Sequence, residues 1–209
     1  MQLSARRRGM GVKGPYDARI EYLESRANCY INTGINAANN IGLELEYVDT
    51  YNYGNCSNYV IGARVTQNST ILYSISGATA TNAVSVTYNG SSNTLSYTRK
   101  KNDKYHAIVN AHGSTMDWEI TINDTNIQLG TINGTDLGTT NTPICMFGFN
   151  ASNIKQYTRL YYLKMKRNGV IVRDFIPVRV GTVGCLYDRV SRSLFYNTGS
   201  GTFVLGPDK

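Results

Sequence analysis

Residues 170–206 read VIVRDFIPVRVGTVGCLYDRVSRSLFYNTGSGTFVLG, a series of short apolar runs separated by turn-forming residues. Asn168 and Gly169 stand directly before this stretch, and both residue types accept the positive φ that a type I′ turn requires. The segments on either side of the turn, 158–166 and 170–178, are therefore predicted to pair as an antiparallel hairpin.

Two further turns are predicted within the same stretch. Asp188 opens a tight turn, in which its carboxylate can accept hydrogen bonds from free backbone N–H groups. Residues 197–201, NTGSG, form a glycine-rich reversal before a last strand at 202–205. This end of the chain is thus predicted to consist of antiparallel hairpins.

Alternation along the strand that precedes Asn168 predicts which side chains it buries. Successive side chains of a strand point to opposite faces, which puts Tyr161, Leu163 and Met165 together. Leu160 and Tyr162 then lie on the opposite face, together with the charged residues Lys164 and Lys166. Because both faces carry apolar side chains near the start, the strand is predicted to be covered on both faces there.

Short strands bounded by turn-forming residues are predicted along the rest of the chain. They are 21–35 as a strand pair, 41–48, 59–65, 71–75, 84–88, 93–99, 105–110, 116–122, 127–129 and 144–149. Asn89-Gly90 predicts another hairpin turn, and Trp118 belongs to an apolar stripe that is predicted to be core. The charged bend 99–104 is predicted to be a surface hairpin end, and the polar run 130–142 to be a long loop.

Length and composition are typical of one all-β domain. The chain has 209 residues, of which 41% are hydrophobic, with 20 Gly and 16 Tyr. The predicted fold class is a two-sheet antiparallel β-sandwich over residues 16–209, preceded by an extended basic arm, 1–15. No apolar run reaches the length of a transmembrane helix, and the start of the chain lacks the apolar region of a secretion signal. We therefore expect a soluble, unsecreted chain.

The predicted arm is basic and contains no acidic residue. Such a segment cannot bury enough apolar surface to order itself, so it is interpreted either as a solvated tail or as an arm that docks on a partner. The candidate docking residues are Arg6, Arg7, Arg8 and Lys13. Nucleic acid is not expected as the partner, because the formal net charge of +7 is modest and much of its excess lies in the arm.

Several motifs carry a resemblance to a known family. They are EYLESRANCYINTGI at 21–35, DFIPV at 174–178, GCLYD at 184–188, LFYN at 194–197 and GSGTFVLG at 199–206. Together they resemble the concanavalin A-like, laminin-G-like jelly-roll modules of bacterial and bacteriophage proteins. The resemblance implies a jelly-roll sandwich, but leaves the function open, because such modules serve as lectins, glycosidases, adhesive modules and virion parts.

No cofactor or metal site is predicted. The four cysteines, Cys29, Cys56, Cys145 and Cys185, form no CxxC pair, and reduced thiols are favoured although a disulfide stays open. His106 and His112 have no nearby cluster of Asp and Glu that would complete a ligand set. No spaced acidic loop indicates calcium.

The sharpest enzymatic candidate is the sequence Glu44-Leu45-Glu46-Tyr47-Val48-Asp49. Glycosidases of the resembled fold carry an E-x-D-x-x-E strand motif, whereas this chain has E-x-E-x-x-D and so departs at two of the three acids. Acids that alternate on a solvent-facing strand are also common without any catalytic role. A structural role is therefore predicted for these acids.

A glycan site is considered at the tyrosine-rich loop that follows this strand. Sugars need an aromatic face for their apolar side and fixed donors and acceptors for their hydroxyl groups. The loop offers these groups in Tyr51, Asn52, Tyr53 and Asn55. With 16 tyrosines in the chain, the cluster is also expected by chance or at a subunit interface.

The function predicted from sequence is a non-catalytic structural or adhesive module of a larger assembly. The resemblance and the arm favour a bacteriophage virion protein, a capsid decoration or head fibre, whose arm contacts capsid proteins. The alternatives are a carbohydrate-binding module on a bacterial cell surface and a glycoside hydrolase of the same fold. A homo-oligomer is expected, a host or environmental glycan is a candidate ligand, and no membrane contact is expected.

Overall fold

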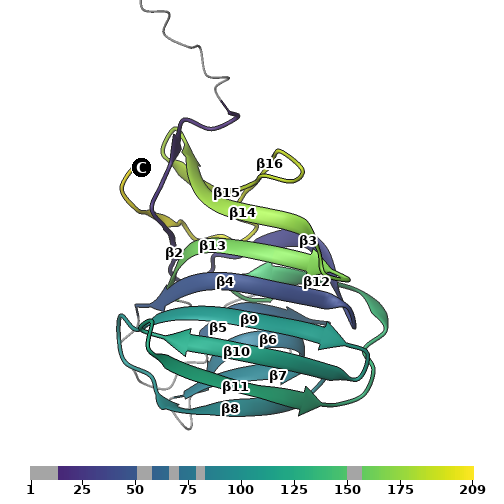
Figure 1. Cartoon of the computed structure of the whole chain (residues 1–209). Helices are drawn as coiled ribbons and strands as arrows, with labels where there is room; N and C mark the ends of the chain where they lie inside the picture. The colour runs from purple at the N-terminus through teal and green to yellow at the C-terminus, as the bar shows by residue number, and fades with distance from the viewer. Residues whose placement is uncertain (1–13, 51–57, 66–70, 79–82, 150–156) are drawn as a thin grey trace, which may run out of the picture.

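The computed structural model describes residues 14–50, 58–65, 71–78, 83–149 and 157–209. Two antiparallel sheets lie face to face in these residues, with no helix among them, so the predicted all-β sandwich is confirmed (Figure 1). The arm 1–15 falls almost entirely outside the described residues, and its boundary stays a prediction. Within the part described, no helix is long and apolar enough to cross a membrane.

The larger sheet faces the viewer in Figure 1 and has the strand order β11-β10-β9-β4-β13-β14-β15-β16, with β1, β2 and β17 attached at its side. Its strands are β1 (Ala18–Arg19), β2 (Leu23–Ser25), β4 (Ile41–Asp49), β9 (Lys104–His112), β10 (Thr115–Ile122), β11 (Asn126–Asn133), β13 (Thr158–Arg167), β14 (Val170–Val180), β15 (Val183–Asp188), β16 (Ser193–Phe195) and β17 (Val204–Leu205).

The smaller sheet lies behind it in the order β3-β12-β5-β6-β7-β8. Its strands are β3 (Ile31–Ala38), β5 (Asn58–Arg64), β6 (Ile71–Ala78), β7 (Ala83–Tyr88), β8 (Ser91–Thr98) and β12 (Thr139–Met146). The run 130–142, predicted as a long loop, instead contains the end of β11 and the start of β12. That prediction is wrong because ladder hydrogen bonds to neighbouring strands form whether the side chains are polar or apolar.

The predicted turns at Asn168-Gly169 and at Asp188 are confirmed, whereas residues 197–201 do not close a hairpin, because the last strand, β17, pairs with β2 and not with β16. Asn168 and Gly169 have φ values of 49° and 79°, and Arg167 pairs with Val170 across the turn. Both central residues thus occupy the left-handed region that a type I′ turn demands. Asp188 accepts hydrogen bonds from the backbone N–H groups of Val190 and Ser191, the last two residues of its turn, as predicted.

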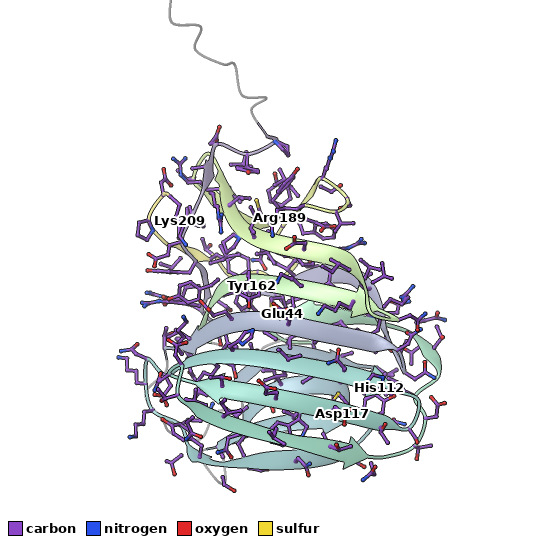
Figure 2. All side chains as sticks on the ribbon, in the orientation of Figure 1. Glu44, His112, Asp117, Tyr162, Arg189 and Lys209 are labelled. Atoms are coloured by element: carbon purple, nitrogen blue, oxygen red, sulfur yellow. The ribbon has the colours of Figure 1, made fainter. Side chains whose placement is uncertain are left out.

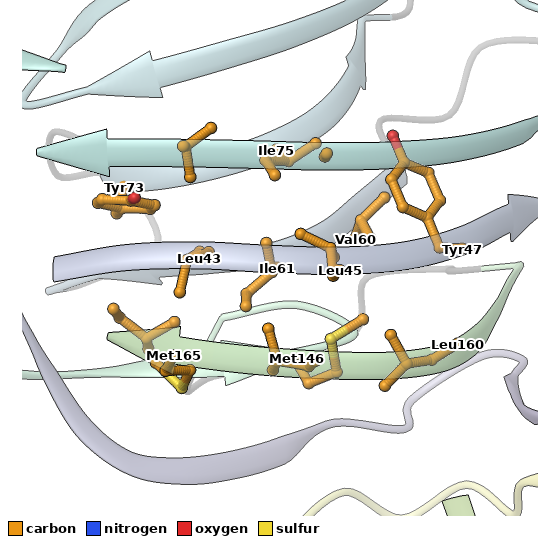
Figure 3. Packing of buried hydrophobic residues seen from close by; sticks show 14 of the residues in the cluster. Leu43, Leu45, Tyr47, Val60, Ile61, Tyr73, Ile75, Met146, Leu160 and Met165 are labelled. Atoms are coloured by element: carbon orange, nitrogen blue, oxygen red, sulfur yellow. The ribbon is translucent and has the colours of Figure 1, made fainter. Parts of the chain in front are cut away.

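The core lies between the facing sides of the two sheets. Figure 3 shows Leu43 and Leu45 of β4 packed near Ile61 of β5 and Ile75 of β6. The side chain of Trp118 is 8% exposed and belongs to this same core, so its predicted core role is confirmed.

The charged bend 99–104 is not a surface hairpin end throughout. Arg99 and Asp103 are only 6% and 5% exposed. Arg99 donates to Asp49 over 3.0 Å, and Asp103 accepts from the hydroxyl of Tyr97 over 3.1 Å and from the backbone N–H of Lys100 over 2.7 Å. The predicted surface position is wrong for these two residues. Arg99 is buried against the opposite charge of Asp49, and Asp103 is buried where hydrogen-bond donors reach its carboxylate.

Candidate binding face of the large sheet

The side of the large sheet that points away from the core is the candidate functional site. On β4, Leu43 and Leu45 are buried in the core, whereas Glu44 and Glu46 are partly exposed on the opposite side. Figure 2 labels Glu44, Tyr162, His112 and Asp117 along this side. We call it the outer face.

The strand registers arrange the outer face into three rows that run across β13, β4, β9, β10 and β11. The first row is Tyr162, Glu46, His106, Thr121 and Ile127, the second is Lys164, Glu44, Ile108, Glu119 and Leu129, and the third is Lys166, Gly42, Asn110, Asp117 and Thr131. Adjacent rows lie two residues apart, which is about 6.6–6.8 Å along a strand. The outer face therefore combines charged, aromatic and amide groups on one regular grid.

A β-bulge in β13 puts two tyrosines on the outer face. Leu160 stands opposite Tyr47 of β4, and Tyr162 stands opposite Glu46, so that Tyr161 is the extra residue between them. Leu160 and Leu163 are fully buried, whereas Tyr161 and Tyr162 are both partly exposed. The charge of Glu46 acts on both tyrosine hydroxyls.

The predicted grouping of Tyr161 with Leu163 and Met165 is thus wrong, and Leu160, which alternation puts on the opposite face, shares their buried side instead. Simple alternation would bury every second residue, but the bulge inserts one residue and shifts the pattern by one position. Leu160 and Leu163 then both reach the core although they are three positions apart, and the two tyrosines between them stay partly exposed, with the ring centre of Tyr161 5.9 Å from that of Tyr22. Bulges are frequent next to functional sites, where they change the direction of a side chain.

Charged groups surround the two tyrosines. The hydroxyl of Tyr162 donates to Glu44 over 3.4 Å, and the Lys164 ammonium lies 5.2 Å from the centre of the Tyr162 ring. The ring centre of His106 is 6.4 Å from that of Tyr162. Burial, followed by the charges of Glu44 and Glu46, raises the pKa of Tyr162 to about 12. Tyr162 therefore keeps its hydroxyl proton and remains a hydrogen-bond donor at neutral pH.

Glu44 and Glu46 are ion-paired on this face. Glu44 accepts from Lys164 over 2.7 Å and from Lys166 over 3.5 Å, while Lys104 lies 3.2 Å from Glu46. Burial alone would raise the pKa of Glu44, but the hydrogen bond from Lys164 and the charges of both lysines outweigh it and hold this pKa below its usual value. Glu44 is therefore an ionised acceptor at neutral pH.

The three acids of the E-x-E-x-x-D sequence do not share one face. Glu44 and Glu46 lie on the outer face, whereas Asp49 is 3% exposed and paired with Arg99 inside the end of the sandwich. The structure thus brings together two of the three acids.

The outer face is hollowed between β9 and β11. A depression of about 320 Å³ is lined by residues that include Ile108, Asn110, Glu119 and Leu129. Leu129 is 73% exposed, an unusual position for a large apolar side chain. Apolar and acidic groups therefore border the same hollow.

The site residues predicted from sequence are not brought into this face. Arg6, Arg7, Arg8 and Lys13 of the arm, and Tyr51, Asn52, Tyr53 and Asn55 of the loop, all lie outside the described residues, and their roles stay predictions. His106 lies in the first row, and the His112 ring lies 3.8 Å from Asp117. Among the described residues, no three of His, Cys, Asp and Glu cluster as they would around a metal ion.

The cysteines that the structure describes are free and buried. They are Cys29, Cys145 and Cys185, and Cys56 lies outside the described residues. Burial raises the pKa of Cys145 to about 12 and that of Cys185 to about 11, so neither forms a thiolate at neutral pH.

Sequence reasoning missed the pair of tyrosines on the outer face. A signal was present in Leu160-Tyr161-Tyr162-Leu163, where two leucines stand three positions apart within a strand. Both leucines can reach one core from a strand only if an extra residue lies between them.

Comparisons with known proteins support the fold. No protein-family model matches the sequence, and no curated protein matches it. A solved structure of a candidate carbohydrate-binding protein from Bacteroides ovatus is similar, with a TM-score of 0.55 and 12% sequence identity over 91% of this chain. This chain covers 61% of that protein's length. At such low identity the likeness shows a shared β-sandwich fold.

The prediction that the chain is not an enzyme requires correction, because two enzymes are among the similar structures. A mutant of Trypanosoma rangeli sialidase with trans-sialidase activity has a TM-score of 0.46 and 11% identity, covering 62% of this chain and 21% of its own. Scytalido-glutamic peptidase has a TM-score of 0.49 and 12% identity, covering 88% of this chain and 98% of its own.

Proposed function

We propose that the chain is a carbohydrate-binding β-sandwich module that holds a glycan on the outer face of its large sheet. The observation that carries this proposal is the bulge in β13, which places Tyr161 and Tyr162 next to each other among charged groups. Sugar rings stack their apolar faces on aromatic side chains, while their hydroxyl groups require fixed donors and acceptors. The outer face supplies both kinds of group.

The charged residues next to the tyrosines have separate roles in this proposal. Glu44 and Glu46 accept hydrogen bonds from sugar hydroxyl groups, and Lys164 donates to sugar oxygens. Their existing ion pairs are partly exposed, and such pairs contribute only about 0–1 kcal/mol each. A sugar that forms hydrogen bonds with these groups in place of the ion pairs therefore gives up little stabilising free energy.

The similarity to the candidate carbohydrate-binding protein of Bacteroides ovatus supports this class of function. Within the class, the sequence resemblance supports a concanavalin A-like, laminin-G-like module. A bacteriophage virion, with attachment through the arm, is the setting we propose, and a bacterial cell surface is the alternative. Self-association on such a surface remains part of this proposal.

A glycan array probed with the full chain tests the proposal. Binding should weaken about tenfold in Tyr162→Ala and in Tyr161→Ala, which corresponds to about 1.4 kcal/mol per variant. Tyr196→Ala is the matched control, because Tyr196 is 46% exposed near the C-terminal end of the chain. Absence of binding to any glycan, or equal binding by all three variants and the unaltered chain, would reject the outer face as a glycan site.

Glycoside hydrolysis is a second candidate function, favoured by the position of two carboxylates on one open face. Glu44 and Glu46 are two residues apart on β4 and both point to the outer face, and inverting glycosidases likewise use two carboxyl groups, one as acid and one as base. Release of reducing ends from a bound glycan, lost in Glu46→Gln, would establish this function. Binding without any release would leave the chain as a binding module.

A further inference from the structure

We propose that a cavity at one end of the outer face binds the carboxylate-bearing sugar unit of an acidic glycan. This inference rests on the proposed glycan-binding function and assigns its ligand class. The cavity has a volume of about 480 Å³ and lies where β4 begins, β9 ends and β13 turns into β14. Gly42, Asn110 and Lys166, which form part of its lining, are also members of the third row of the outer face.

The charge of the cavity favours an anionic ligand. Among the described residues that line it, none is acidic, and Lys166 carries a positive charge. His112 also lines it, with its Nε2 atom 3.8 Å from Asp117, which lies outside the lining. Lys166 lies 3.5 Å from Glu44, but Lys164 holds the other oxygen of that carboxylate at the shorter distance of 2.7 Å. Since Lys164 already compensates the charge of Glu44, the Lys166 ammonium can turn toward a ligand carboxylate at small cost.

The remaining polar groups of the cavity are amides, which suit sugar hydroxyl groups. Asn40, Asn110 and Asn168 are among the lining residues. The side-chain oxygen of Asn40 is buried and has no hydrogen-bond partner among the described residues. Its backbone oxygen accepts from the N–H of Asn168 over 3.0 Å, which fixes the position of this residue. The amide groups that line the cavity can donate to and accept from sugar hydroxyl groups.

Gly42 keeps the floor of the cavity open. A Cβ atom at this position would lie 2.5 Å from the side-chain oxygen of Asn110, closer than real atoms approach. Because glycine has no side chain, the Asn110 amide extends over the β4 backbone and faces the cavity.

Calorimetric titration of the full chain with matched sugar pairs tests the inference. The first pair is sialyllactose and lactose, and the second is trigalacturonate and its methyl ester, so that sialic and uronic acids are distinguished. In at least one pair the acidic member should bind about tenfold more tightly than the neutral one, and raised salt should narrow the difference.

Two lysine variants locate the source of the preference. Lys166→Met should abolish the preference for the acidic sugar, because it removes the ammonium from the cavity. Lys164→Met is the matched control, since Lys164 also pairs with Glu44 and has the same 31% side-chain exposure but does not line the cavity. It should weaken acidic and neutral sugars alike and leave their ratio unchanged.

The possible results separate this inference from the proposed function. Tyr162-dependent binding of sugars with no acidic preference, or a preference that survives in Lys166→Met, would overturn the inference and leave the proposed function intact. Failure of every sugar in both pairs and on the array would overturn both.

Discussion

The turn at Asp188 should stabilise the fold strongly, and its contribution can be worked out from its hydrogen bonds. Asp188 is fully buried, and its Oδ1 atom accepts from the N–H of Asp174 over 2.8 Å and from that of Val190 over 3.1 Å. Its Oδ2 atom accepts from the N–H of Ser191 over 3.1 Å. Arg173 lies 3.6 Å from the same Oδ2 atom.

Asp188→Ala removes the hydrogen bonds from these three backbone N–H groups, and the three donors differ in what replaces the carboxylate. The Asp174 N–H belongs to β14, between β13 and β15, and would lose its partner at a cost of about 1–3 kcal/mol. Val190 and Ser191 are exposed, so water can replace the carboxylate there, at a cost of about 0.5–1.5 kcal/mol or less each. We expect Asp188→Ala to lower the free energy of unfolding by about 3 kcal/mol, or the melting temperature by roughly 6–12 °C.

Asp188→Asn separates the charge from the hydrogen bonds. Burial would raise the pKa of Asp188, but hydrogen bonds from the side chain of Ser191 and from the three backbone N–H groups outweigh it and lower the pKa. A carboxylate with a lowered folded-state pKa stabilises the protein above its unfolded value of about 3.9 and loses that contribution as the pH falls through the folded value. The stability difference between the unaltered chain and Asp188→Asn should therefore be largest near neutral pH and shrink below about pH 4.

Urea denaturation followed by circular dichroism at pH 7, 5 and 3 measures these differences. A loss below about 1 kcal/mol in Asp188→Ala would refute the hydrogen-bond reasoning. A difference between Asp188→Asn and the unaltered chain that is the same at all three pH values would refute the charge reasoning.

Three other substitutions test the packing and the turns. Gly130→Ala puts a Cβ atom 2.8 Å from the ring of Trp118, so it should lower the free energy of unfolding by about 1–3 kcal/mol. It should also shift the fluorescence of Trp118, the single tryptophan of the chain, and unchanged emission would contradict this close packing. Asp49→Asn removes the charge that lies 3.0 Å from the buried Arg99 guanidinium and should lower the free energy of unfolding by about 3 kcal/mol or more in thermal denaturation, whereas a loss near zero would show that the pair is not buried. Gly169→Ala puts a side chain at a position with φ of 79° and should lower the free energy of unfolding, measured in urea, by about 1–2 kcal/mol. An unchanged free energy of unfolding would show that the turn is not type I′.

The turns could be predicted from sequence because their causes are local. Asn168 and Gly169 adopt positive φ whatever the rest of the fold does, and the Asp188 carboxylate reaches N–H groups only two and three residues away. Alternation also predicted the outward direction of Glu44 and Glu46, because β4 contains no bulge between them.

The candidate site could be predicted only in part, because it depends on contacts between distant segments. The partner of Arg99 is Asp49, fifty positions away, so its burial could not be inferred from a charged bend. The outer face is built by the registers of β13, β4 and β9, which alternation within a single strand does not specify.

A crystal structure of the chain bound to its best glycan from the array would show directly whether the outer face holds the sugar. We expect a sugar ring against Tyr161 or Tyr162 on the outer face, with a hydroxyl group hydrogen-bonded to Glu44 or Glu46. A glycan bound to the small sheet or at the loops, with both tyrosines uncovered, would contradict it.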